Sequence, residues 1–214
     1  MTKRFVTNGK VKTVIEGLNL TIPTGRSVGL LGRNGSGKST LLRLIAGSSE
    51  PTSGTIITTG LVSWPVGFAG SFHTDLTGLQ NCRFIARIYG VDTGELVDFV
   101  EDFAGIGMHF RLPLRTYSSG MRSRLAFAVS MGIQFDTYLV DEITAVGDAA
   151  FRASADRLFK ARTRNAGAVV CSHAMEQIRL LCDCGLVLDN GQGWFHNNVE
   201  DAILHHQDNM NRIS

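Results

Sequence analysis

The segment GRNGSGKST at residues 32–40 constrains this chain more than any other feature. It fits the phosphate-loop pattern GxxxxGK[ST], with Gly32, Gly37, Lys38 and Ser39 at the fixed positions. The apolar run VGLL at 28–31 predicts a strand before the loop, and STLLRLIAG predicts a helix after it. Such a loop turns backbone N–H groups and the positive end of a helix dipole toward phosphate oxygens. We therefore expect a nucleotide phosphate site here.

The residues of this loop have expected roles in binding ATP. The Lys38 ammonium would reach the β and γ phosphates, and the Ser39 hydroxyl would ligate Mg²⁺. The other expected ATP contacts come from Gly32, Arg33, Asn34, Gly35, Ser36, Gly37 and Thr40.

Two acidic residues end the apolar run TYLVDE at 137–142. Doubly wound sheets place their ligands at the carboxyl ends of strands. Beside a phosphate loop, Asp141 is suited to hold the magnesium shell, and Glu142 to orient or deprotonate the attacking water. Without the loop, the two carboxylates would simply indicate a solvated strand end.

His173 closes the next predicted strand, VVCSH at 169–173. A histidine there could hydrogen-bond the γ phosphate or the attacking water, so Lys38, Glu142 and His173 are the catalytic candidates. We expect structural roles for the other histidines, with the adjacent pair near the carboxyl end forming a solvated tail; these are His73, His109, His196, His205 and His206.

Apolar periodicity predicts a single α/β domain. A further strand is expected at 186–191, and helical periodicity runs from about residue 70 to residue 134. The expected division is an ATPase core at 1–69 and 134–214 with a helical subdomain at about 70–133. From about Glu200 the sequence is polar, which predicts a loose terminal helix.

Composition narrows the class of protein. A net charge of +2 and the absence of any run of five like charges exclude nucleic acid as an obvious partner. No apolar stretch approaches the roughly 20 residues that span a bilayer, and the first residues lack a signal-peptide core. We expect a soluble, cytoplasmic chain whose cysteines are core thiols; these are Cys82, Cys171, Cys182 and Cys184.

The stretch TYSSGMRSRLAFAVS passes from small residues directly into a predicted helix. With the phosphate loop, the Asp–Glu strand and the histidine, it resembles the ATP-binding subunits of ABC transporters over essentially the whole chain. The resemblance implies a P-loop ATPase core with an antiparallel β edge and an inserted helical subdomain. Where that family usually has Leu-Ser-Gly-Gly-Gln, this chain has Tyr117-Ser118-Ser119-Gly120-Met121. The resemblance implies that Ser118, Ser119, Gly120 and Met121 contact the γ phosphate bound by the opposite subunit of a head-to-tail homodimer.

Three segments are similar to the capsular-polysaccharide exporter subgroup: YSSGMRSRL, WPVGFAGSF from Trp64, and VDEITAVGDAAF from Val140. This implies a peripheral subunit at the cytoplasmic face of the inner membrane, working with an integral membrane permease and with periplasmic and outer-membrane export components. The helical subdomain and the loop from Trp64 to Phe72 would transmit movement to the permease. The stretch after His173 is too short for a carbohydrate-recognition domain of at least about 50 residues, which favours capsule or teichoic-acid export over O-antigen export.

Two further assignments come from the same resemblance. Residues Ala145 to Asp148 would form the loop that touches the partner's site, with Asp148 as its acidic member. Phe5 would stack on adenine, and the alternative is that an aromatic residue there packs against the protein. The glutamine that most members place before the helical insert is not evident between Pro65 and Phe72.

Two other classes of protein stay open at this point. One is a soluble ABC ATPase serving translation or DNA repair, which would usually show paired ATPase halves, a long coiled coil or basic patches. The other is a nucleotide-dependent switch that hydrolyses ATP poorly. The residues Lys38, Asp141 and Glu142 argue against the second class.

Overall fold

The computed structural model describes residues 1–7, 9–67, 70, 72–141 and 147–211. Contacts between residues divide the chain into two compact units. Unit 1 comprises 1–65, 135–142 and 163–214, and unit 2 comprises 66–134 and 143–162. Residues 143–162, which the sequence analysis assigned to the ATPase core, therefore group with the helical residues. The functional division into core and subdomain stays a prediction.

A mainly parallel sheet forms the centre of unit 1, in the strand order β4-β5-β6-β3-β7-β8. Neighbouring strands are parallel except β7 and β8, which pair antiparallel. The middle strands are apolar runs that are buried on both faces, as parallel strands in an α/β fold must be. The bounds are β3 Ser27–Gly32, β4 Val62–Pro65, β5 Thr137–Asp141, β6 Gly167–Cys171, β7 Cys184–Asp189 and β8 Gln192–His196.

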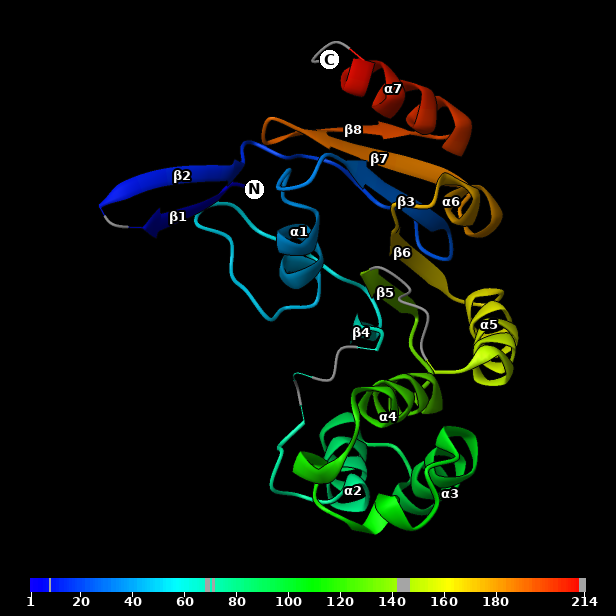
Figure 1. Ribbon diagram of the computed structural model, residues 1–214. Coiled ribbons are helices and arrows are strands. Elements are labelled where there is room, and N and C mark those ends of the chain that lie inside the picture. The colour runs from blue at the N-terminus through cyan, green and yellow to red at the C-terminus, as the bar shows by residue number, and fades with distance from the viewer. Residues whose placement is uncertain (8, 68–69, 71, 142–146, 212–214) are drawn as a thin grey trace. The chain divides into compact units, whose positions relative to one another are not determined.

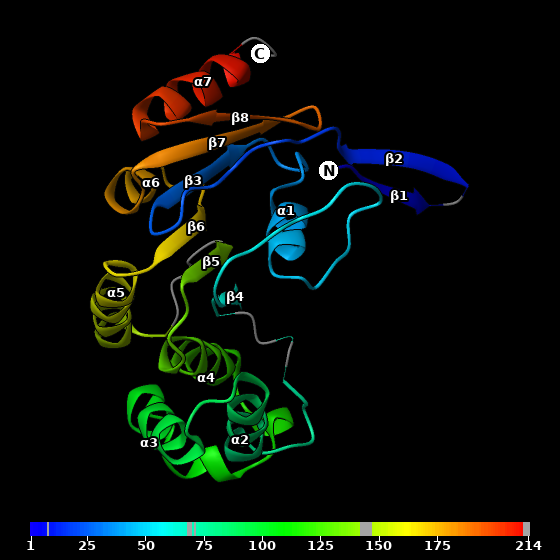
Figure 2. The ribbon, with the colours of Figure 1, turned by 180° about the vertical axis from the view of Figure 1, so that it is seen from behind.

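Helices cover both faces of this sheet (Figures 1 and 2). Helix α1 (Lys38–Ile45) lies on one face, where Leu41, Leu42 and Leu44 are buried against the strands. Helices α6 (Met175–Leu181) and α7 (Val199–Asn211) lie on the other. The core of unit 1 is thus two apolar layers on either side of β3.

The expectation of a loose helix after Glu200 is wrong. Helix α7 buries Val199, Ala202 and Ile203 against β7 and β3. A Cβ placed on Gly185 of β7 would lie 2.3 Å from the Ala202 Cβ, so the helix and the strand approach each other closely at this glycine. Most polar residues of α7 lie on its outer faces, which is why the segment looks polar as a whole.

The amino-terminal residues form the predicted antiparallel edge. Strands β1 (Lys3–Thr7) and β2 (Lys10–Ile15) pair with each other in a separate two-stranded sheet. The α/β architecture expected from the sequence is therefore confirmed.

Unit 2 is helical, and capping side chains mark where two of its helices begin. Its helices are α2 (Gly78–Tyr89), α3 (Thr93–Ala104), α4 (Ser119–Gly132) and α5 (Ala149–Thr163), with 3₁₀ turns η2 (Gly107–Arg111) and η3 (Leu114–Thr116). Thr77 and Gln80 form a capping box that starts α2, and the Asp92 side chain caps α3. Phe103, Phe127 and Phe151 bring α3, α4 and α5 together, with ring centroids 5.4–6.1 Å apart.

Among the described residues, no helix combines the length and the apolar character that crossing a bilayer requires. All four cysteines are buried thiols, as the composition predicted. Burial raises the pKa of the Cys82 and Cys182 thiols to about 12, so these two thiols are not reactive at neutral pH.

Candidate functional site

The phosphate loop needs glycine at two positions for steric reasons. Gly37 caps the amino end of α1 with φ +105°, and a Cβ there would lie 2.8 Å from the Val14 Cγ1. At Gly32 a Cβ would lie 2.4 Å from the Leu188 carbonyl oxygen. Any larger residue would therefore push the loop away from β2 or β7, and the pattern recognised in the sequence has a packing cause.

The Lys38 side chain folds back over the loop. Its Nζ donates hydrogen bonds to the carbonyl oxygens of Gly32, at 2.6 Å, and of Arg33, at 2.9 Å. The Ser36 amide also donates to the Arg33 carbonyl, at 3.1 Å, and the Ser36 hydroxyl is buried beneath the loop. These contacts hold the ammonium group over the loop.

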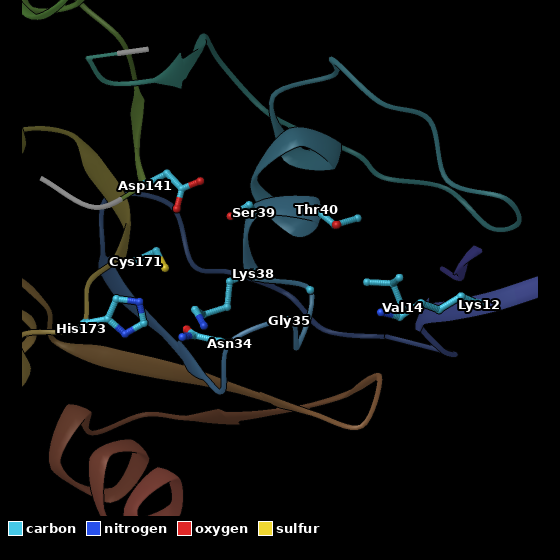
Figure 3. A pocket seen from close by; sticks show the side chains of 11 residues that line it. Lys12, Val14, Asn34, Gly35, Lys38, Ser39, Thr40, Asp141, Cys171 and His173 are labelled. Carbon is cyan, nitrogen blue, oxygen red and sulfur yellow. The ribbon is translucent and has the colours of Figure 1, made fainter. Parts of the chain in front are cut away.

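A cavity in unit 1 brings together most of the predicted site (Figure 3). The loop and α1 provide one wall, the ends of β5 and β6 provide another, and β2 provides a third. The sequence-predicted residues on its wall are Asn34, Gly35, Gly37, Lys38, Ser39, Thr40, Asp141 and His173. Cys171 joins them, while Gly32, Arg33 and Ser36 belong to the loop but do not line the cavity.

Sheet register explains why Asp141 and His173 meet. Asp141 is the last residue of β5 and stands opposite Cys171, the last residue of the parallel strand β6. His173 follows two residues later, beyond the strand rather than at its end as expected. The turn that carries it is held by Ser172, whose hydroxyl donates to Gln177 Oε1 at 2.9 Å and accepts from the Ala174 amide at 3.1 Å.

The oxygen donors on the cavity wall suit Mg²⁺. The Ser39 hydroxyl and the Asp141 carboxylate line the same cavity and belong to different elements, α1 and β5. Mg²⁺ usually takes one or two protein oxygens and completes its shell with water and phosphate oxygens. Among the described residues, no three or more His, Cys, Asp or Glu side chains are grouped so that they could hold a metal ion by themselves.

The sequence analysis missed the contribution of β2. Lys12 and Val14 line the cavity, and Phe5 stands directly opposite Lys12 in the β1–β2 pair. Directly opposed residues of an antiparallel pair share one face of the sheet, so Phe5 shares a face with Lys12. Phe5 is 42% exposed, and the Lys3 Nζ lies 5.0 Å from the centroid of its ring. The alternation in KVKTVI indicates the strand, but no local signal indicates that it borders the loop.

The segment Ser118 to Met121 lies in unit 2, at the amino end of α4. Ser118 is the cap of that helix, and its hydroxyl accepts a hydrogen bond from the Met121 amide at 3.2 Å. Ser118 and Ser119 are exposed, and Gly120 follows within the first turn. The segment is therefore an accessible helix amino terminus, which is a general anion-binding feature.

Asp148 caps a different helix of unit 2. Its Oδ1 accepts from the Phe151 amide at 2.9 Å, and its Oδ2 forms an ion pair of 2.6 Å with Arg124. The hydrogen bond from the Phe151 amide, helped by the charge of the Arg124 guanidinium, outweighs the opposing effect of burial and holds the pKa of Asp148 below its usual value. Glu142 and Ala145 lie outside the described residues, as does Phe68 of the loop that begins at Trp64.

The expectation of a solvated histidine tail is also wrong. His196 Nε2 and His205 Nδ1 are 2.9 Å apart, and the His205 ring also contacts Trp194. Burial and the neighbouring His205 lower the pKa of His196. His206 is partly buried, and burial, with Lys38 and His173 next, lowers its pKa as well.

Comparison with known proteins gives a consistent result. The ABC transporter family profile matches residues 15–145. A polysialic acid transport ATP-binding protein of Escherichia coli is 46% identical over 207 residues, covering 95% of this chain and 92% of that protein. A capsule polysaccharide export ATP-binding protein of Neisseria meningitidis serogroup B is 39% identical over 202 residues, covering 94% of each. The solved structure of a dimeric ATP-binding cassette bound to ADP and Pi has a TM-score of 0.76 at 20% identity, covering 92% of this chain and 96% of that one, which shows a shared fold.

Proposed function

Because the chain belongs to the ABC transporter ATP-binding family, whose members bind and hydrolyse ATP, we propose that it is the ATP-hydrolysing subunit of an exporter that drives capsular polysaccharide across the inner membrane. The observation that carries this proposal is the 46% identity to the polysialic acid transport protein over nearly the full length of both chains. The similarity to the meningococcal capsule export protein points to the same cargo class.

ATP binds along the loop in this proposal. The Lys38 ammonium leaves the carbonyl oxygens of Gly32 and Arg33 for the β and γ phosphates, where it meets full negative charge. Loop amides from Gly32 to Thr40 surround the phosphates, and Phe5 stacks on adenine. The shared face of Phe5 and the cavity residue Lys12 supports that position for the base.

Mg²⁺, held by Ser39 and Asp141, would neutralise charge on the phosphates when bound. The chain's own groups then act on the attacking water. Glu142 orients this water or accepts its proton, and His173 donates a hydrogen bond to the γ phosphate or to the water. The position of His173 on the cavity wall beside Lys38 supports its role.

Two chains sandwich two ATP molecules in the active state. Ser118, Ser119, Gly120 and Met121 of one subunit contact the γ phosphate bound by the other, and Asp148 adjoins the partner's site. The exposed amino end of α4 supports this arrangement, because it offers amide and hydroxyl groups to an anion. Binding closes the dimer, and hydrolysis with phosphate release reopens it.

The chain works at the cytoplasmic face of the inner membrane, attached to an integral membrane permease that connects with periplasmic and outer-membrane components. We assign the permease contact to unit 2 and to the loop from Trp64 to Phe72. Phe84 and Ile88 support this assignment, because they lie one turn apart on α2 and are 57% and 59% exposed. Exposed apolar pairs of this kind suit a protein interface.

Complementation tests the proposal. The gene is placed in a capsule-forming bacterium that lacks its own exporter ATP-binding subunit, and surface polysaccharide is measured with an antibody. We expect the wild-type chain to restore export and the Lys38→Ala chain to fail, although both chains are made in equal amounts. Restoration of O-antigen or teichoic-acid display, with no effect on capsule, would move the cargo to another surface glycan.

A further inference from the structure

Strand β2 is fixed beside the phosphate loop at its carboxyl end. The Glu16 amide donates a hydrogen bond to the Gly191 carbonyl oxygen at 2.7 Å, and Ile15 is buried in the core. Val14 packs on the loop, since a Cβ placed on Gly37 would lie 2.8 Å from the Val14 Cγ1. The side of β2 that bears Val14 therefore faces the loop.

Lys12 lies on the same side of this strand. Side chains alternate along a strand, so residues two apart share a side, and Lys12 precedes Val14 by about 7 Å along β2. Both residues line the cavity. Lys10 shares this side but lies another two residues away, and it does not line the cavity. Of the two lysines in β2, a strand that the structure describes throughout, Lys12 is therefore the one that reaches the site.

The groups along the cavity follow a definite order (Figure 3). Asp141 and His173 lie at one end, Lys12 and Val14 lie at the other, and Thr40 of α1 lies between them. In the proposed function the first end holds Mg²⁺ and the γ phosphate. Lys12 thus stands at the opposite end, toward the strand pair that would hold the base.

The ammonium group of Lys12 is available for a ligand. No other residue that the structure describes gives it a hydrogen bond or an ion pair. Lys3, beside Phe5, is engaged, because its Nζ donates to the Glu50 carbonyl oxygen at 2.6 Å and lies over the Phe5 ring. Strands β1 and β2 carry no acidic residue, and among the described residues of the cavity wall the one acid, Asp141, is at the far end. An anionic ligand would therefore supply the counter-charge of Lys12.

Building on the function proposed above, we propose that Lys12 is a second cation of the nucleotide site, which binds the α phosphate while Lys38 binds the β and γ phosphates. The α phosphate joins the nucleoside to the rest of the polyphosphate, so it lies between the loop and the strand pair that holds the base. Lysine suits this contact because its flexible stem carries a compact charge with three donors. The contact raises affinity for ATP and ADP alike, since both carry an α phosphate.

The test compares the affinities of purified full-chain variants by calorimetric titration with ADP and with the β,γ-imido analogue of ATP, both with Mg²⁺. Lys12→Met removes the charge, Lys12→Gln keeps a hydrogen-bond donor without charge, and Lys12→Arg keeps both. Lys10→Met is the matched control, because it removes the same charge from the same face of β2 outside the cavity.

We expect Lys12→Met and Lys12→Gln to lower the affinity about tenfold for both nucleotides, which is the lower end of what a hydrogen bond to a charged group contributes. Lys12→Arg should keep most of the affinity, and Lys10→Met should stay within about twofold of the wild type. The loss in Lys12→Met should shrink at high salt, because an exposed charge pair is screened. At saturating ATP, kcat should stay within about twofold, since Lys12 lies at the opposite end of the cavity from His173.

Four results would overturn the proposal. Wild-type affinity in Lys12→Met would show that Lys12 does not contact the nucleotide. A loss for the ATP analogue alone would move the contact to the γ phosphate, and wild-type affinity in Lys12→Gln would show that charge is not what matters. An equal loss in Lys10→Met would indicate a general attraction by the strand pair. A wild-type chain that binds neither nucleotide would refute the proposed function itself.

Discussion

Replacing Lys38 with methionine removes one charge and leaves the aliphatic part of the side chain nearly intact. In the structure its Nζ donates to two neutral carbonyl oxygens, those of Gly32 and Arg33. Binding of ATP exchanges these bonds for two bonds to anionic phosphates. At about 3 kcal/mol for each bond to phosphate and about 1.5 kcal/mol for each bond given up, the net contribution is about 3 kcal/mol. At 1.4 kcal/mol per tenfold, ATP affinity should fall about 100-fold.

Equilibrium titration with a fluorescent ATP analogue measures this affinity. Lys10→Met is the matched control, since Lys10 is an exposed lysine of β2 that does not line the cavity, and its affinity should stay within about twofold of the wild type. Thermal denaturation of both variants checks that the fold is intact. If a folded Lys38→Met chain binds the analogue within about threefold of the wild type, Lys38 does not contact the phosphates and the reasoning fails.

Other changes separate chemistry, packing and coupling. Glu142→Gln should keep ATP binding but stop turnover, and sedimentation with ATP and Mg²⁺ should then show a stable dimer; a monomer at saturating ATP would count against the sandwich. Gly185→Ala should destabilise the fold by about 1–3 kcal/mol in a denaturant titration, because its methyl group would overlap Ala202, and an unchanged midpoint would show that α7 can move away freely. The pKa of His196 in the folded chain lies below its unfolded value of about 6.5, so the unfolded chain binds a proton first as pH falls. Tm should therefore drop as pH falls through about 6.5, and His196→Gln should reduce this drop. A His196→Gln chain with the same pH profile of Tm as the wild type would contradict the lowered pKa of His196. Phe84→Ser should leave ATPase activity within about twofold of wild type and Tm within a few degrees, but should lower the amount of surface polysaccharide. Normal export by this variant would show that α2 does not contact the permease.

The phosphate loop was predictable because its requirements are local. Positive φ at Gly37, the lysine and the helix that follows are all encoded within a few residues. The meeting of Asp141 with His173 was predictable for a related reason, since parallel strands bring their carboxyl ends to one edge. In the first case one short pattern carries the information, and in the second it takes two short strand patterns and a general rule of sheet topology.

The parts that sequence reasoning missed depend on distant partners. Lys12 reaches the cavity only because β2 docks beside the loop, where Val14 contacts Gly37. The narrow apolar face of α7 is hidden among polar residues, and its packing depends on a glycine in β7 that looks unremarkable in isolation. Likewise, Phe151 alone does not reveal that α5 packs with α3 and α4.

The strand order of the core sheet determines when β3 can pair with its neighbours during synthesis of the chain. Strand β3 is synthesised early, yet both of its neighbours, β6 and β7, come from the last third of the chain. At 5–20 residues per second, the ribosome needs roughly ten to thirty seconds to supply the first of them. During that interval the apolar residues Val28, Leu30 and Leu31 have no strand to pair with, so a nascent chain exposes a strand that is prone to aggregate. The phosphate loop at the end of β3 therefore acquires its final support only when synthesis is nearly complete, and a chain truncated before β6 should be recovered as insoluble material rather than as a nucleotide-binding fragment.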